Sequence, residues 1–157
     1  MGTQFSSRPC GRYQKHTLKE IVKIRIGIVP VFENSPSKYK ILVDNKLFFE
    51  TNNSFRSGTA QYHDLDVPLD PGPHNLDIRL DPNGLQFENI EVVQLAFNNQ
   101  KARDIDCFLL GEYLLDQPRL IDGVLKNKID QCTVLGFPGT YRVGFSTPIM
   151  AWMIRNL

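Results

Sequence analysis

Residues 64–98 alternate apolar and polar side chains in three segments separated by turn residues, and this pattern limits the fold more than any other feature of the chain. In residues 74–80 every second side chain is apolar, which is the period of a strand that buries one face. Residues 65–69 repeat the alternation, and the sequence Asp-Pro-Gly-Pro at 70–73 is typical of a turn. The pattern therefore predicts a hairpin across residues 65–80.

The third segment, residues 89–97, changes its apolar parity between Val92 and Leu95. One inserted residue in a β-bulge near Val93 and Gln94 would keep the apolar side chains before and after it on the same buried face. We therefore predict a bulge at this point of the strand.

Similar patterns predict further strands along the chain. A strand at 22–28 should stop at Pro30, because proline cannot donate a ladder hydrogen bond. The other expected elements are a hairpin of 39–43 and 47–50 turned by Asp44-Asn45-Lys46, a weaker strand, turn and strand at 105–115, and a final pair of strands at 132–135 and 140–145.

These elements predict an all-β protein with one antiparallel, jelly-roll-like β-sandwich at residues 18–157. The chain has 157 residues, enough for one well-buried core, and its ten prolines and eleven glycines punctuate it as in sandwiches and barrels. Residues 146–148, Ser-Thr-Pro, resemble a helix start, and Ile149, Trp152 and Met153 follow at helical spacing. A short closing helix is favoured there over an edge strand.

Residues 1–17 are polar and irregular, and we expect them to form an extended basic arm. The first 25 residues hold six basic residues against Glu20, a net charge of +5, which leaves −4 on the rest of the chain. Arg8, Arg12 and Lys15 are candidates for contacts with an acidic partner surface, although a solvated tail explains the same charges. Nucleic acid is disfavoured because aromatic residues do not alternate with the basic ones.

Several classes of protein are disfavoured by what the sequence lacks. No apolar run approaches the roughly 20 residues that a membrane helix needs. The first residues have no secretory pattern, so we expect no export by that route. Three widely spaced cysteines indicate free thiols, with a Cys107–Cys132 disulfide as the alternative. No catalytic or cofactor motif is present, so we expect no enzyme and no cofactor.

The runs VPLDPGPHNLDIRLDPNG and FENIEVVQL, with YKILVDNKLFF upstream, resemble calcium-dependent carbohydrate-binding modules of the xylan-binding type. The resemblance covers roughly residues 21–98 and implies a β-sandwich that holds a calcium ion and a sugar with polar loop residues. The positions that correspond to such ligands are Asp81, Asn83, Glu88 and Asn89.

In overall character the chain also resembles accessory structural proteins of tailed bacteriophages, which occur in the capsid, neck or tail. Its basic arm and the apolar C-terminal segment PIMAWMIRNL would then contact other subunits, with Trp152 as an anchor. The alternative for this segment is that it completes the core of its own domain, with Trp152 as a core residue. The first hypothesis is therefore a non-enzymatic virion protein, homo-oligomeric and assembled in the host cytoplasm. The alternative is a cation-dependent carbohydrate-binding module.

Overall fold

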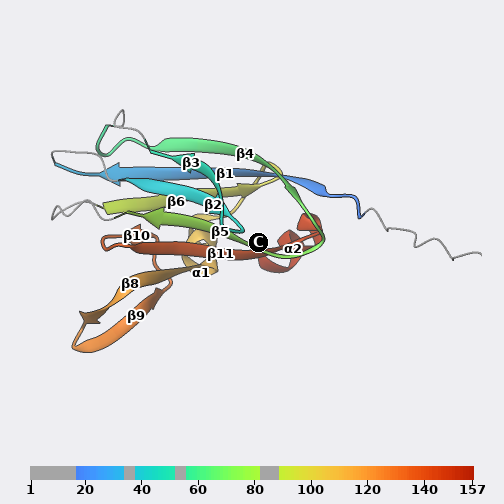
Figure 1. Ribbon diagram of the computed structural model, residues 1–157. Helices are drawn as coiled ribbons and strands as arrows, with labels where there is room; N and C mark the ends of the chain where they lie inside the picture. Colours follow the sequence, from blue (N-terminus) through green and yellow to red (C-terminus); the bar gives the residue numbers. More distant parts are fainter. Residues whose placement is uncertain (1–16, 34–37, 52–55, 82–88) are drawn as a thin grey trace, which may run out of the picture.

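The structure, a computed structural model, describes residues 17–33, 38–51, 56–81 and 89–157, which form two antiparallel β-sheets packed face to face (Figure 1). The strands are β1 (Glu20–Val31), β2 (Tyr39–Val43), β3 (Lys46–Glu50), β4 (Gln61–Leu69), β5 (Gly72–Leu80), β6 (Asn89–Phe97), β7 (Gln100–Lys101), β8 (Gly111–Ile121), β9 (Val124–Asp130), β10 (Val134–Leu135) and β11 (Gly139–Thr147). The helices are α1 (Asp104–Leu110) and α2 (Ile149–Asn156). The predicted antiparallel β-sandwich and its closing helix are confirmed.

The two sheets differ in size. The five-stranded sheet has the order β10-β6-β1-β4, with β7 also paired to β6, and the six-stranded sheet has the order β3-β2-β5-β11-β8-β9. Strands β8 and β9 form a hairpin that projects from the body of the sandwich (Figure 1). No described helix is long and apolar enough to cross a membrane.

The core lies between the sheets and is built from the apolar positions of the period-two patterns. Near α2 it is aromatic: the Phe97 ring lies 5.3 Å from the Phe145 ring and 5.1 Å from the Trp152 ring, measured between centroids. Trp152 is only 9% exposed, so its indole fastens α2 to both sheets. Burial of large aromatic side chains is a major stabilising contribution in a domain of this size.

Two local predictions are confirmed by the strand register. In the pairing of β1 with β6, Gly27 faces Gln94 and Ile28 faces Val92, so Val93 is the inserted residue of the predicted bulge. The β2–β3 hairpin turns at Asp44 and Asn45, which have φ angles of 48° and 64°. These two residue types tolerate positive φ better than most, as the turn requires.

The predicted hairpin across residues 65–80 is wrong. Strand β4 pairs with β1 in the five-stranded sheet, whereas β5 pairs with β2 and β11 in the six-stranded sheet. The turn at residues 70–73 therefore crosses from one sheet to the other. The predicted pair at 132–145 is wrong for the same reason, because β10 pairs with β6 and β11 pairs with β5 and β8. Alternation shows which face a strand buries, but not which strand lies beside it.

The type of one element and the end of another also need correction. Residues 104–110 form helix α1 and not a strand, and Asp106 accepts hydrogen bonds from the backbone and side chain of Arg103 at its start. Strand β1 continues through Pro30, where the ladder with β4 has already ended at Ile28. Pro30 pairs with Ile90 of β6 on one side, and on the other its carbonyl oxygen accepts a hydrogen bond from the Gly58 backbone at 2.8 Å. A proline is tolerated where one side of its strand is unpaired.

Candidate functional site

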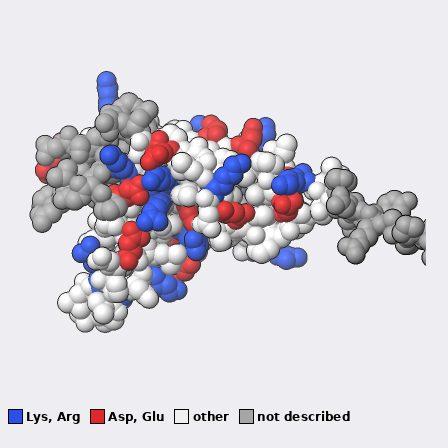
Figure 2. Space-filling model, in the orientation of Figure 1, with Lys and Arg blue, Asp and Glu red and all other residues white. Residues whose placement is uncertain are grey.

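A row of charged side chains crosses the outer face of the six-stranded sheet. Strand register places Asp77 of β5 beside Arg142 of β11, Arg142 beside Glu112 of β8, and Glu112 beside Asp130 of β9. All four side chains point away from the core, because each strand alternates its buried and outer positions. Acidic and basic side chains are likewise intermixed on the face of the molecule seen in Figure 2.

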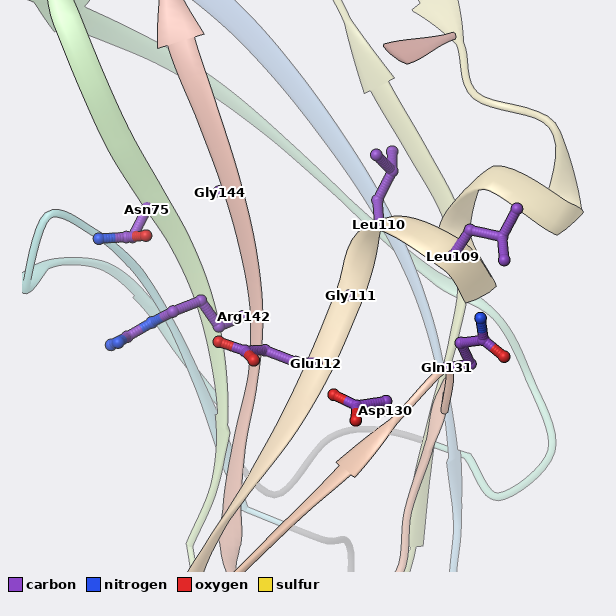
Figure 3. A pocket seen from close by; sticks show the side chains of 9 residues that line it. All are labelled: Asn75, Leu109, Leu110, Gly111, Glu112, Asp130, Gln131, Arg142 and Gly144. Carbon is purple, nitrogen blue, oxygen red and sulfur yellow. The ribbon is translucent and has the colours of Figure 1, made fainter.

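Arg142 is held in place by a bidentate ion pair. Its Nε and Nη2 donate to Oδ1 and Oδ2 of Asp77 at 2.7 and 2.8 Å. This pairing raises the pKa of the Arg142 guanidinium above its usual value, so the group stays charged at any accessible pH. The Glu112 carboxylate points toward Arg142 from the opposite side (Figure 3) and lies 3.6 Å from Nζ of Lys128.

A pocket of about 350 Å³ opens at the end of this row. It exists because β8 begins at Gly111, opposite Val143, so that no described strand pairs with Gly144 and the following residues of β11 on that side. The rest of its lining consists of Asn75, Leu109, Leu110, Glu112, Asp130, Gln131 and Arg142. The side chains of Asn75, Glu112 and Arg142 point into the same space (Figure 3).

The pocket continues along β5 and β11 into a second hollow of about 410 Å³, which shares Asn75 and Gly144 with it. His74 forms part of this second hollow and is fixed from both sides. Its Nδ1 lies 2.6 Å from Oδ2 of Asp44 and its Nε2 lies 2.8 Å from the Asp70 carbonyl oxygen. We call the two hollows together the β5–β11 groove. Its donors and acceptors suit a ligand with many hydroxyl groups.

The predicted calcium ligands are not assembled by the described residues. Asp81 uses Oδ2 for an ion pair with Lys40 at 3.0 Å and Oδ1 for one with Arg79 at 3.5 Å. Asn89 begins β6 in the other sheet, and Asn83 and Glu88 lie outside the described residues. Within the described ranges, no group of three acidic, histidine or cysteine side chains is placed to hold a metal ion. The described residues therefore do not fit a calcium site, and we derive no binding step through this ion.

The candidate partner-contact residues lie at the two ends of the chain. Arg8, Arg12 and Lys15 fall outside the described residues, as does the predicted arm except Thr17. Trp152 is packed in the core. Exposed apolar side chains occur in the same C-terminal segment, at Met150 and Ile154 of α2, and on the projecting β8–β9 hairpin, at Leu120 and Leu125.

A buried histidine lies between the sheets, away from the groove. His63 Nε2 is 2.8 Å from the Tyr39 hydroxyl, and its ring lies 4.0 Å from the Phe49 ring, measured between centroids. Burial lowers the pKa of His63 and raises the pKa of Tyr39. Because His63 is only 9% exposed, it serves as a core residue and not as a ligand contact.

We expect this histidine to make the fold sensitive to acid. As the pH falls through 6.5, the ordinary pKa of histidine, the unfolded chain takes up the proton before the folded protein does, so the free energy of unfolding decreases. His63→Gln keeps a polar partner for Tyr39 and removes the titration. Urea unfolding at pH 8 and pH 5.5 should show a smaller decrease in the free energy of unfolding for the variant than for the wild type. Equal losses in both proteins would contradict the assignment.

The comparisons with known proteins bear on the fold. The sequence matches no protein-family model and no curated protein. Among solved structures it is similar to vCBM60 in complex with galactobiose, with a TM-score of 0.52 and 11% identity over 78% of this chain and 97% of that one. The chain shares the β-sandwich fold of a carbohydrate-binding module. A selenomethionine form of vCBM60, from work on two families of calcium-dependent carbohydrate-binding modules, has a TM-score of 0.49 at 12% identity, over 78% of this chain and 90% of that one.

At 11% identity, the similarity to vCBM60 in complex with galactobiose shows the β-sandwich fold. Neither of the two similar solved structures is described as a phage structural protein. The virion role, its location in the host cytoplasm and the subunit contacts of the arm stay predictions from the sequence.

Proposed function

We propose that this protein is a non-catalytic carbohydrate-binding module that takes a neutral saccharide in the β5–β11 groove. The observation that carries the proposal is the similarity to vCBM60 bound to galactobiose, which extends over 97% of that chain. Similarity at 11% identity extends to the fold, whereas the ligand position in the groove rests on this chain's own residues.

The groove offers the hydrogen-bonding groups that vicinal hydroxyls need. Arg142 donates, Glu112 and Asp130 accept, and Asn75 and Gln131 do both. The Asn75 side chain has no hydrogen-bond partner among the described residues, so its amide is available to a ligand. Gly144 leaves room beside it for a ring to approach the strand.

The charge of the groove favours a neutral sugar over an acidic one. Arg142 is already neutralised by Asp77, and Lys128 is shared between Glu112 at 3.6 Å and Asp130 at 3.2 Å. Three carboxylates thus face two cations. A uronic acid would place a further negative charge beside them, whereas a neutral hydroxyl exchanges water hydrogen bonds for protein ones.

We expect galactobiose or neutral xylo-oligosaccharides to bind the full chain in isothermal titration calorimetry, and Asn75→Ala to weaken that binding about five- to tenfold. Asn127→Ala, an exposed asparagine of the projecting hairpin, is the matched control and should leave the affinity unchanged. Binding should also persist in EDTA, because the groove has no metal cluster among its described side chains.

Three outcomes would count against the proposal. If none of these saccharides binds, the function is wrong. If they bind with full affinity to Asn75→Ala, the groove is the wrong site. If EDTA abolishes binding, the sugar is held through a cation, which would favour the calcium ligands predicted from the sequence over the groove.

A further inference from the structure

The outer face of the five-stranded sheet carries an exposed aromatic ring above a glycine. Tyr62 of β4 pairs with Gly27 of β1, and a Cβ added to Gly27 would lie 3.0 Å from Cε1 of the Tyr62 ring. The missing side chain of Gly27 therefore lets the ring lean over the strand instead of standing away from it. Tyr62 nevertheless remains 50% exposed.

The Tyr62 ring lies in a polar groove of about 410 Å³. Its lining residues are Arg25, Tyr62, Asp64, Gln94, Ala96, Asn99 and Lys101. The Arg25 guanidinium carbon is 5.1 Å from the centroid of the Tyr62 ring, and its Nε is 3.7 Å from Oδ1 of Asp64. These two contacts fix the ring and the guanidinium relative to each other. We call this hollow the Tyr62 groove.

The β-bulge of β6 supplies the opposite wall of the Tyr62 groove. Because Val93 is inserted, Gln94 faces Gly27 across the strand pair, and its Cβ would lie 3.0 Å from a Cβ added to that glycine. A bulge that redirects a side chain in this way is a common feature beside binding sites. Ala96, the next outward residue of β6, is small and leaves space between Arg25 and Lys101.

Several polar groups of the Tyr62 groove are available to a ligand. Within the described part of the chain, the Tyr62 hydroxyl, the Gln94 amide and the Lys101 ammonium have no side-chain partner. A buried structural tyrosine would differ in both respects: Tyr39, Tyr113 and Tyr141 are each almost fully buried and have a hydrogen-bonded hydroxyl. Packing in the core therefore does not explain why a tyrosine stands at position 62.

We propose that the Tyr62 groove is a second saccharide site, in which the C–H face of a pyranose ring packs on Tyr62 while Gln94, Arg25 and Lys101 hydrogen-bond its hydroxyls. An exposed aromatic ring beside side chains that donate and accept hydrogen bonds complements the mixed apolar and hydroxylated surface of a sugar. The site rests on the proposed function, since it extends saccharide binding to a second face.

The two sites have a joint consequence for polysaccharides. The outer faces of the two sheets point away from each other in a sandwich, so the Tyr62 groove, on β1, β4 and β6, and the outer-face part of the β5–β11 groove lie on opposite faces of the sandwich. One protein could then bridge two polysaccharide chains. Binding to a polymer at two positions also raises the apparent affinity without any new contact.

The test measures how many saccharides bind per chain and whether the Tyr62 ring responds to binding. Galactobiose and xylo-oligosaccharides are titrated into the full chain by calorimetry, and Tyr62 ring signals are followed by NMR. We expect two sites per chain in the wild type, about tenfold weaker binding at one of them in Tyr62→Ala, and retention of both in Tyr62→Phe. Gly27→Ala should also weaken the site, because its methyl group displaces the ring.

Phe137→Ala is the matched control. Phe137 is another exposed ring with an arginine above it, Arg119 at 5.0 Å, but it lies outside the Tyr62 groove, so its removal should change neither site. If the sugars bind in the β5–β11 groove while Tyr62→Ala changes nothing and the Tyr62 signals stay still, the inference is wrong and the proposed function stands. If no sugar binds to any of these proteins, both are wrong.

Discussion

We expect Gly111→Ala to lower the free energy of unfolding by about 3 kcal/mol or more, as overpacking does in a rigid core. Gly111 begins β8 directly beneath the Tyr141 ring, and a Cβ built there would overlap Cε2 and Cζ of that ring. The ring cannot move aside easily, because it is fully buried and its hydroxyl donates to the Cys107 carbonyl oxygen at 2.5 Å. The backbone is not the obstacle, since the φ of −91° at Gly111 suits alanine.

Two further comparisons separate this clash from the general effect of replacing glycine. Gly136→Ala has open space around the added carbon and should stay within about 1 kcal/mol of the wild type, because it mainly restricts the unfolded chain. In a Tyr141→Leu background, Gly111→Ala should cost less than it does alone, since the overlapping ring atoms are gone. Urea unfolding of the wild type, the three single variants and the double variant measures these differences in the free energy of unfolding. An equal cost of Gly111→Ala in both backgrounds would contradict the explanation.

The fold could be predicted from the sequence because burial in a sandwich has a period of two. Alternation in residues 65–69 and 74–80 correctly indicated strands with one buried face, and the parity change after Val92 correctly located the bulge. Strand pairing could not be predicted in the same way. Both β4 and β5 bury one face whether they lie in one sheet or in two, so the turn between them looked like a hairpin.

The candidate sites were missed because their members are distant in sequence. Asp77 and Arg142 are separated by 65 positions and meet only because β5 and β11 are neighbours in the sheet. One local signal was available at Gly27, since a glycine in the middle of an apolar strand often marks a close approach of another group. Its partner Tyr62, however, is brought beside it by strand register alone.

The second prediction with a large expected effect concerns the ion pair between Asp77 and Arg142, which holds the Arg142 side chain in place. We expect Arg142→Ala to destabilise the fold by about 2–4 kcal/mol, because it leaves the Asp77 carboxylate, whose side chain is only 8% exposed, without its partner. Asp77→Ala should cost less, about 1 kcal/mol, because the Arg142 side chain is 35% exposed and can be hydrated, and it still faces Glu112.

The double variant tests this asymmetry directly. Removing both partners leaves no buried charge unpaired, so Asp77→Ala with Arg142→Ala should be more stable than Arg142→Ala alone, although it has lost more atoms. Denaturant unfolding of the wild type, the two single variants and the double variant gives the four free energies of unfolding, which can be compared when the m-value is the same for all four. A double variant less stable than both single ones would mean that the pair acts mainly through packing. The charges of Asp77 and Arg142 would then contribute little to the free energy of unfolding beyond the packing of the two side chains.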